Sequence, residues 1–72
     1  MEEQRYGRAL VGKRAFNQVL QEELCAKAGI YRQTLIDIEN ERVTLSVDDY
    51  NRLSQLIDAI IKERELGVAS EV

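Results

Sequence analysis

The sequence predicts an all-α fold, a small helical bundle that ends in a long C-terminal helix. Three observations lead to this prediction. The 72 residues contain no proline and are 44% apolar, a composition typical of a compact helical protein. Two short helical patterns meet at Gly29, and a longer apolar pattern with helical spacing extends from Val47 to Leu66.

Length and charge limit the kinds of protein that this chain can be. Its 72 residues make one domain near the lower size limit for an unassisted core, where oligomerisation is a common remedy. The net charge is −3, but residues 1–34 carry six Lys and Arg against four Asp and Glu, while residues 35–72 carry four against nine. An acidic protein can still present a basic face, because local potential is what attracts phosphate.

The cysteine count and the apolar pattern bear on location and chemistry. A single cysteine excludes an internal disulfide and fits a reducing compartment. No apolar run is long enough to span a membrane, and the N-terminus lacks a signal-peptide pattern, so we expect a cytoplasmic protein. The sequence has no histidine, no glycine-rich phosphate loop and no metal-ligand cluster. We therefore expect neither an enzyme nor a bound cofactor or metal.

The first helix is expected over residues 2–16. Tyr6, Leu10 and Arg14 recur there at helical spacing. Gly12 is expected to allow the close approach of another helix, because glycine has no Cβ. Three basic residues of this helix would form a solvated face that can touch phosphate: Arg5, Arg8 and Lys13.

Residues 17–20 connect the first helix to the second, and we expect Val19 and Leu20 to point inward. The second helix begins at Gln21 with an acidic first turn. Its apolar positions at helical spacing are Leu24, Cys25 and Ala28. We interpret Cys25 as a small buried hydrophobic residue, in preference to the alternative of a reactive thiol.

Gly29 is expected to adopt the left-handed conformation that ends the second helix. The third helix is expected over residues 31–40, with Leu35 and Ile38 facing inward. Two helices joined by a tight glycine turn form a helix-turn-helix, whose second helix can lie in the major groove of DNA. The residues expected on its outer side are Tyr31, Arg32, Gln33, Thr34 and Asp37.

The last helix follows a short loop in which Val43 and Leu45 are expected to fill the core. Ser46 is a strong N-cap with an acidic residue three positions later. The apolar pattern then continues to Gly67, which is expected to end the helix. We therefore expect a domain over residues 1–66 and a flexible tail over residues 67–72.

The apolar stripe of this last helix is longer than a small domain can cover. Its second half is therefore expected to protrude or to pack on another copy of the chain, giving a homodimer through Ile57, Ile60 and Ile61. A membrane-surface helix is the weaker interpretation, because the polar face is mixed and partly acidic.

The segment from Gln21 to Ile30, QEELCAKAGI, resembles the pattern Q-x-x-L-A-x-x-x-G-[VI] of the Cro/C1-type (XRE) helix-turn-helix family of phage and bacterial repressors. The resemblance covers about residues 8–57 and implies a lambda-repressor-like fold. It also includes Arg14, Leu35, Ile38, Glu39 and Asn40. The chain differs from the family in having Leu20 where a Thr or Ser cap is usual, Glu41 where a small residue is usual, and one long helix in place of two short ones.

The resemblance also implies roles for individual residues. Arg14 and Glu39 are expected to form an ion pair between the first helix and the recognition helix. Arg32 and Gln33 occupy the family's main base-reading positions, and their side chains suit guanine and adenine respectively. Asp37 would repel phosphate unless it accepts a hydrogen bond from a cytosine amine. The expected phosphate contacts are Gln21, Tyr31, Thr34, Arg42 and Lys13.

Two functions follow from these expectations. The first is a sequence-specific transcriptional regulator, a repressor, that binds double-stranded DNA as a homodimer on two operator half-sites. The alternative is a protein-binding antirepressor, antitoxin or co-regulator that uses the same fold with weak DNA binding. Acidic residues such as Asp37 and Glu41 favour the alternative, whereas Arg32, Gln33 and the basic first half favour DNA.

Overall fold

The computed structural model describes residues 5–70, and side chains as far as Gly67. This part of the chain folds into four helices: α1 (Tyr6–Phe16), α2 (Gln21–Ala28), α3 (Arg32–Glu39) and α4 (Val47–Ser70). The predicted all-α bundle with a long C-terminal helix is confirmed. None of the described helices is both long enough and apolar enough to cross a membrane.

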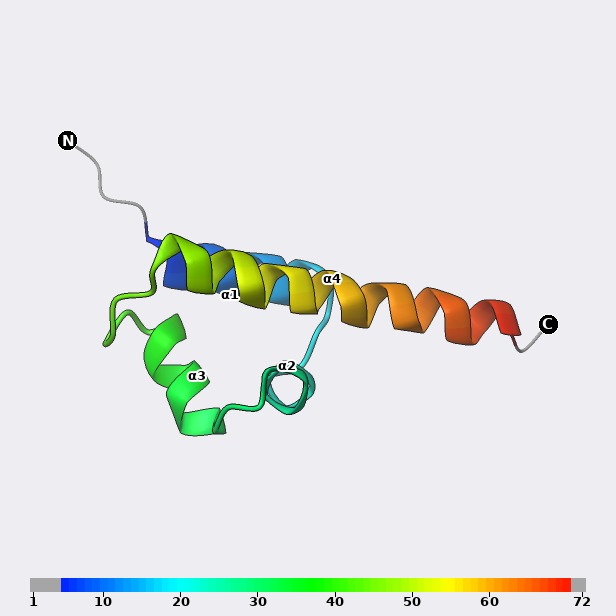
Figure 1. The fold of residues 1–72 in the computed structure, drawn as a ribbon, viewed down its shortest axis with the longest axis horizontal. Coiled ribbons are helices and arrows are strands. Elements are labelled where there is room, and N and C mark those ends of the chain that lie inside the picture. The colour runs from blue at the N-terminus through cyan, green and yellow to red at the C-terminus, as the bar shows by residue number, and fades with distance from the viewer. Residues whose placement is uncertain (1–4, 71–72) are drawn as a thin grey trace.

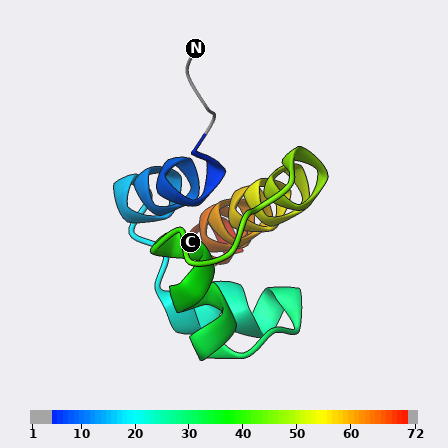
Figure 2. The same ribbon diagram turned by 90° about the vertical axis from the view of Figure 1, so that its left-hand side faces the viewer.

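Helix α4 is the longest element, and α1 and α2 pack along it. Figure 1 shows α1 beside α4, with both helices running in the same direction, while α2 and α3 lie below them. Figure 2 shows the bundle end-on, with α1 and α4 forming one side and α2 and α3 the other. Because α4 has 24 residues and α1 has 11, the C-terminal part of α4 extends well past the end of α1 (Figure 1).

The core is aliphatic and draws on every helix. Its fully buried side chains are Leu10 of α1, Val19 of the first connection, Leu24 of α2, Leu35 of α3 and Ile57 of α4. Tyr6 and Tyr50 close its edge with ring centroids 5.2 Å apart. Helices α1 and α2 both pack on α4 and on α3, which is how so small a domain encloses a core.

Two expectations about α4 are wrong. Ile57 is fully buried and Ile60 is 6% exposed, because α1 and α2 cover this part of α4; Ile61 packs partly against the same core. Ile57 and Ile60 therefore stabilise their own domain and are not a free dimer surface. Gly67 does not end the helix, which continues to Ser70. An interior glycine costs a helix only about 1 kcal/mol, so it need not stop one.

Connecting segments depart from the sequence expectations in two places. Leu20 is 61% exposed and Val43 is 47% exposed, although both were expected to face inward. Gln18 has a positive φ of 56° and Leu20 is extended, so consecutive side chains point to opposite sides and only Val19 enters the core. In the later loop, Leu45 alone fills the core position.

The start of α1 also differs from expectation. The helix begins at Tyr6, and residues 2–4 of the expected 2–16 span lie outside the described residues. A carboxylate from elsewhere in the chain accepts a hydrogen bond from the first turn of this helix: the backbone N–H of Arg8 donates to Glu41 Oε2 at 2.8 Å. Glu41 is thus an N-terminal cap for a helix 33 residues earlier in the sequence.

Candidate nucleic-acid interface

The turn between α2 and α3 fixes where the third helix lies. Gly29 has φ 70° and ψ 36° and ends α2, as predicted, and its N–H donates to the carbonyl of Cys25 at 2.8 Å. Tyr31 is extended and precedes α3, while Leu35 anchors the inner side of that helix in the core. Two short helices joined by a glycine turn result, with the first turn of α3 at the surface.

Cys25 lies inside this motif and is 8% exposed. Burial raises the pKa of its thiol, with the nearby Glu39 carboxylate adding to the effect. A protonated, buried thiol is a poor nucleophile. Cys25 is thus the small buried hydrophobic residue that the sequence predicted.

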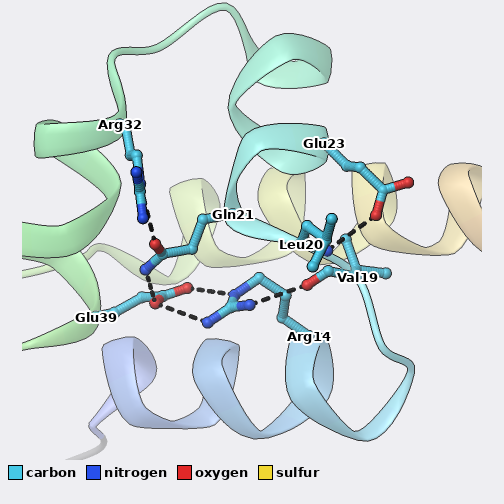
Figure 3. Close-up of polar contacts among 7 residues, drawn as sticks. All are labelled: Arg14, Val19, Leu20, Gln21, Glu23, Arg32 and Glu39. Atoms are coloured by element: carbon cyan, nitrogen blue, oxygen red, sulfur yellow. Dashed lines mark hydrogen bonds and ion pairs between the residues drawn. The ribbon is translucent and has the colours of Figure 1, made fainter.

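An ion pair joins α1 to the end of α3 (Figure 3). Arg14 Nε lies 2.7 Å from Glu39 Oε2, and Arg14 Nη2 lies 3.0 Å from Glu39 Oε1. The third guanidinium nitrogen, Nη1, donates to the carbonyl of Val19 at 2.9 Å. Glu39 is only 9% exposed, so its charge depends on these partners. The predicted pairing of Arg14 with Glu39 is confirmed.

Gln21 extends this ion pair to the surface of α3. Its Nε2 donates to Glu39 Oε1 at 3.0 Å, and its Oε1 accepts from Arg32 Nε at 3.3 Å. We call these four side chains, Arg14, Glu39, Gln21 and Arg32, the Arg14–Arg32 network. Figure 3 shows it as a continuous line of hydrogen bonds from α1 to α3. No pattern in the sequence predicted the contact between Gln21 and Arg32.

Only one edge of the Arg32 guanidinium is used by this network. Its Nε is bound to Gln21, whereas Nη1 and Nη2 have no partner among the described residues, and the side chain is exposed. The orientation of the group is therefore restrained while its terminal donors are free. Such a fork matches two acceptors in one plane.

The outer face of α3 carries a second polar group. Gln33 Nε2 donates to Asp37 Oδ1 at 3.0 Å, and Arg42 Nη1 lies 3.3 Å from the same oxygen. Asp37 is thus balanced by Arg42, and Gln33 is held along the helix. Tyr31 and Thr34 are exposed beside them. The structure therefore brings together Arg32, Gln33, Asp37 and Arg42 around α3.

Lys13 is not part of this surface. Its Nζ donates to Ser54 Oγ at 2.5 Å and lies 2.9 Å from Asp58 Oδ1, both on α4. Lys13, which was expected to contact phosphate, therefore links α1 to α4 instead. Sequence spacing along α1 could not reveal this, because the partner helix is more than 40 residues away.

Most other cations are also used within the chain. Arg52 donates to the carbonyl of Ala28, Arg64 binds the carbonyls of Asn17 and Gln18 together with Glu23, and Lys27 pairs with Glu63. Among the described residues, the cationic side chains without an internal partner are those of Arg5, Arg8 and Lys62; in Arg32, only Nη1 and Nη2 have none. Arg5 and Arg8 lie at the start of α1, beside the C-terminal end of α3.

A groove of about 490 Å³ lies between α1 and α3. Arg8, Val11 and Gly12 of α1 form one wall, and Ile36 of α3 and Asn40, directly after α3, form the other. Gln21 and Glu39, both members of the Arg14–Arg32 network, reach into it, and Glu41 borders it. We call it the α1–α3 groove. No cluster of three or more metal-ligating side chains occurs among the described residues.

Comparisons with models of protein families, with curated proteins and with solved structures found no match to this chain.

Proposed function

We propose that this protein is a sequence-specific regulator that binds double-stranded DNA through α3, and that it acts as a repressor. The observation that carries the proposal is the state of Arg32, which is held through Nε by Gln21 and has Nη1 and Nη2 free at an exposed position. An arginine fork is the group that most often recognises guanine, through O6 and N7 in the major groove. Restraining it beforehand lowers the entropy lost on binding.

The position of Arg32 supports the same proposal. It lies at the first residue of α3, and the N-terminal part of a recognition helix is the part that contacts base edges. The Arg14–Arg32 network holds the C-terminal end of α3 against α1 and α2 through Glu39, and Gln21 links the Arg32 side chain to it. A base-reading side chain that is held by a hydrogen bond on a helix can distinguish sequences better than one on a mobile loop.

Gln33 and Asp37 extend the proposed reading surface. The Gln33 amide donates one hydrogen bond to Asp37, which leaves its carbonyl oxygen and second N–H for a base. Asp37 accepts from Gln33 and Arg42 and has further lone pairs for a cytosine amine. Arg42, Tyr31 and Thr34 flank this surface and are the proposed phosphate contacts.

Two acidic residues that argued against DNA have partners inside the fold. Asp37 is paired with the cation of Arg42, which reduces its repulsion of phosphate. Glu41 keeps its charge but is held at the first turn of α1, where it accepts from the N–H of Arg8. The net charge of −3 is thus compatible with a DNA-binding face.

The proposal includes a homodimer on two half-sites, because helix-turn-helix proteins commonly place two recognition helices one DNA turn apart. Its interface must differ from the one expected from sequence, since Ile57 and Ile60 are buried. Large apolar side chains that remain exposed near the α1–α2 connection and the end of α4 include Phe16, Leu20 and Leu66.

The test is selection from random double-stranded DNA, followed by titration on the enriched sequence. Arg32→Ala should weaken binding by about 1–3 kcal/mol and relax preference at one base position. Lys62→Ala removes one unpaired cation on the far part of α4 and is the matched control, with preference unchanged. If the wild type enriches no sequence, the proposal fails, and recovery of a protein ligand that Arg32→Ala abolishes would favour the protein-binding alternative.

A further inference from the structure

The two glycines of α1 lie in opposite surroundings. A Cβ on Gly7 would lie 2.2 Å from the carbonyl oxygen of Ile38 and 2.9 Å from Glu41 Oε2. Gly7 is therefore required by the packing of α1 against the end of α3. A Cβ on Gly12 would meet no atom within 4 Å. The fold itself thus gives Gly12 no packing role, although close helix approach was expected there.

Gly12 also has no conformational role. Gly29 is the described glycine with a positive φ, so Gly12 has ordinary helical geometry in the middle of α1. A glycine in a helix interior is less stable than alanine. A residue that costs helix stability, and that neither packing nor backbone geometry demands, is explained when another molecule approaches the backbone closely.

The open space beside Gly12 is the α1–α3 groove. Arg8 lies one turn before Gly12 on the same wall, and its guanidinium has no partner among the described residues. Asn40 lies on the opposite wall and is exposed. A molecule that enters the groove would therefore meet a cation, an amide and a bare stretch of backbone.

The carboxylates in the groove are already engaged. Glu39 accepts from Arg14 and Gln21, and Glu41 accepts from the backbone N–H of Arg8. The charge of Glu39 is matched by Arg14, whereas Glu41 keeps its charge, because the N–H that it accepts from is neutral. The donors of the groove without a partner among the described residues are the Arg8 guanidinium and the Asn40 amide, and donors of this kind suit a phosphate oxygen.

We infer that the α1–α3 groove holds the sugar–phosphate backbone of the bound DNA, with Arg8 contacting phosphate and Gly12 admitting the strand. The inference rests on the proposed function and adds a site on α1 to it. Continuity supports it: Gln21 lines the groove and also holds Arg32. When Arg32 contacts a base edge in the major groove, one of the two DNA strands that border this groove must pass beside α3.

The first test fills the groove without disturbing the fold. Gly12→Leu adds a side chain into open space and should melt no lower than the wild type, because it removes a helix-interior glycine. On the selected DNA sequence its affinity should fall by about tenfold or more, the equivalent of about 1.4 kcal/mol. The control is Ala9→Leu, which adds similar bulk at an exposed position of the same helix that does not line the groove; its affinity should be unchanged.

The second test identifies the occupant by charge. Arg8→Ala should lower affinity equally on all sequences and reduce the slope of log K against log salt by about 0.9, the value for one lost phosphate contact. Lys62→Ala, which removes the same charge elsewhere, should leave the slope unchanged. Ethylation of one backbone phosphate should weaken binding of the wild type and have no further effect on Arg8→Ala.

Other outcomes overturn the inference, and they differ from failure of the proposed function. If Gly12→Leu binds like the wild type while Arg32→Ala loses base preference, DNA is read but its backbone does not enter the groove. If Gly12→Leu weakens binding while Arg8→Ala keeps the full salt slope, the groove does not hold a phosphate. If the wild type enriches no sequence at all, the proposed function fails and takes this inference with it.

Discussion

Glu39 depends on its neighbours more than any other charged residue of the described chain. It is 9% exposed, and a buried carboxylate is stable only when charge and hydrogen bonds compensate for lost water. Arg14 supplies two such bonds and Gln21 a third. Because Arg14 also binds the carbonyl of Val19, one guanidinium connects α1, the first connection and α3. The geometry of the candidate interface therefore depends on this pair.

The coupling between these residues can be measured. Arg14→Ala should destabilise the protein by about 3–5 kcal/mol, because it leaves the Glu39 carboxylate buried without its cation. In a double-mutant cycle with Glu39→Ala, measured by urea unfolding, the interaction energy should exceed the roughly 0.5 kcal/mol limit of independent sites. Additive single-mutant effects would contradict a direct pairing.

Glu23 provides a test that depends on pH. Its carboxylate accepts from the backbone N–H of Leu20 at 2.9 Å and pairs with Arg64; these two contacts, the backbone bond first, hold the pKa of Glu23 below its ordinary value. A lowered folded-state pKa contributes stability that is fully present above about pH 4.3, the usual glutamate pKa. That stability is lost as the pH falls through the folded value.

We therefore expect Glu23→Gln to melt at a lower temperature than the wild type at pH 7. The difference should shrink as the pH falls from about 4.3 through the lower folded pKa. Thermal melts followed by circular dichroism at several pH values measure it. Glu22→Gln, on the same turn but exposed, is the control. A Glu23→Gln deficit that stays constant down to pH 2 would show that the carboxylate charge is not what stabilises this end of α2.

At the scale of the helices, α1 lies close against the C-terminal end of α3. Gly7 lets the first turn of α1 lie against the carbonyl of Ile38, and Glu41 then reaches the N–H of Arg8. Glu41 has a positive φ of 63°, a conformation that costs a non-glycine residue about 1–3 kcal/mol. The cap on α1 offsets part of that cost, which explains an acidic residue at a position where a small one was expected.

Adding one methyl group at each α1 glycine should have opposite effects. Gly7→Ala should lower stability by about 1–3 kcal/mol, because the new Cβ would overlap backbone that cannot move freely. Gly12→Ala should raise stability by up to about 1 kcal/mol, because nothing opposes the better helix former. Equilibrium unfolding of the two variants compares them directly. Equal changes of the same sign would mean that α1 does not approach α3 as closely as described.

At the scale of the whole molecule, α4 is the helix to which the other parts of the domain are bound. Two of its arginines bind backbone carbonyls elsewhere in the fold: Arg52 binds the last carbonyl of α2, and Arg64 binds two carbonyls of the α1–α2 connection. The apolar side of α4 is covered by α1 and α2 as far as Ile60. The domain therefore has a core of its own before any second copy is considered.

The placement of Ile60 predicts how its truncation will behave. Ile60→Ala should cost about 2–5 kcal/mol of unfolding free energy, as for other buried aliphatic side chains. The loss should be independent of protein concentration, because the contacts broken lie within one chain. Urea unfolding over a hundredfold range of concentration, with sedimentation velocity in parallel, makes the measurement. Leu66→Ala, at an exposed site, is the control. A loss that appears only on dilution would place Ile60 in an interface between copies.

Much of the fold could be predicted from the sequence because the decisive signals are local. Apolar spacing gave the helices, Gly29 ended α2 through its left-handed backbone, and Ser46 started α4 by accepting from the N–H of Asp49 at 3.1 Å. Such features depend on a few neighbouring residues and on backbone sterics. The pairing of Arg14 with Glu39 was expected only through resemblance, since nothing in the spacing alone joins residues 25 apart.

Tertiary structure alone decided which charges remain available and which apolar residues are covered. Lys13 and Arg8 have similar sequence surroundings, yet Lys13 binds α4 whereas Arg8 borders a groove. Likewise, Gly7 and Gly12 lie in one helix, and only the approach of α3 separates a packing glycine from an open one. The sequence determined by itself that the chain forms helices and where they turn, because those choices are governed by local sterics and hydrogen bonding. How each side chain is used depends on partners distant in sequence, which only the packed structure specifies.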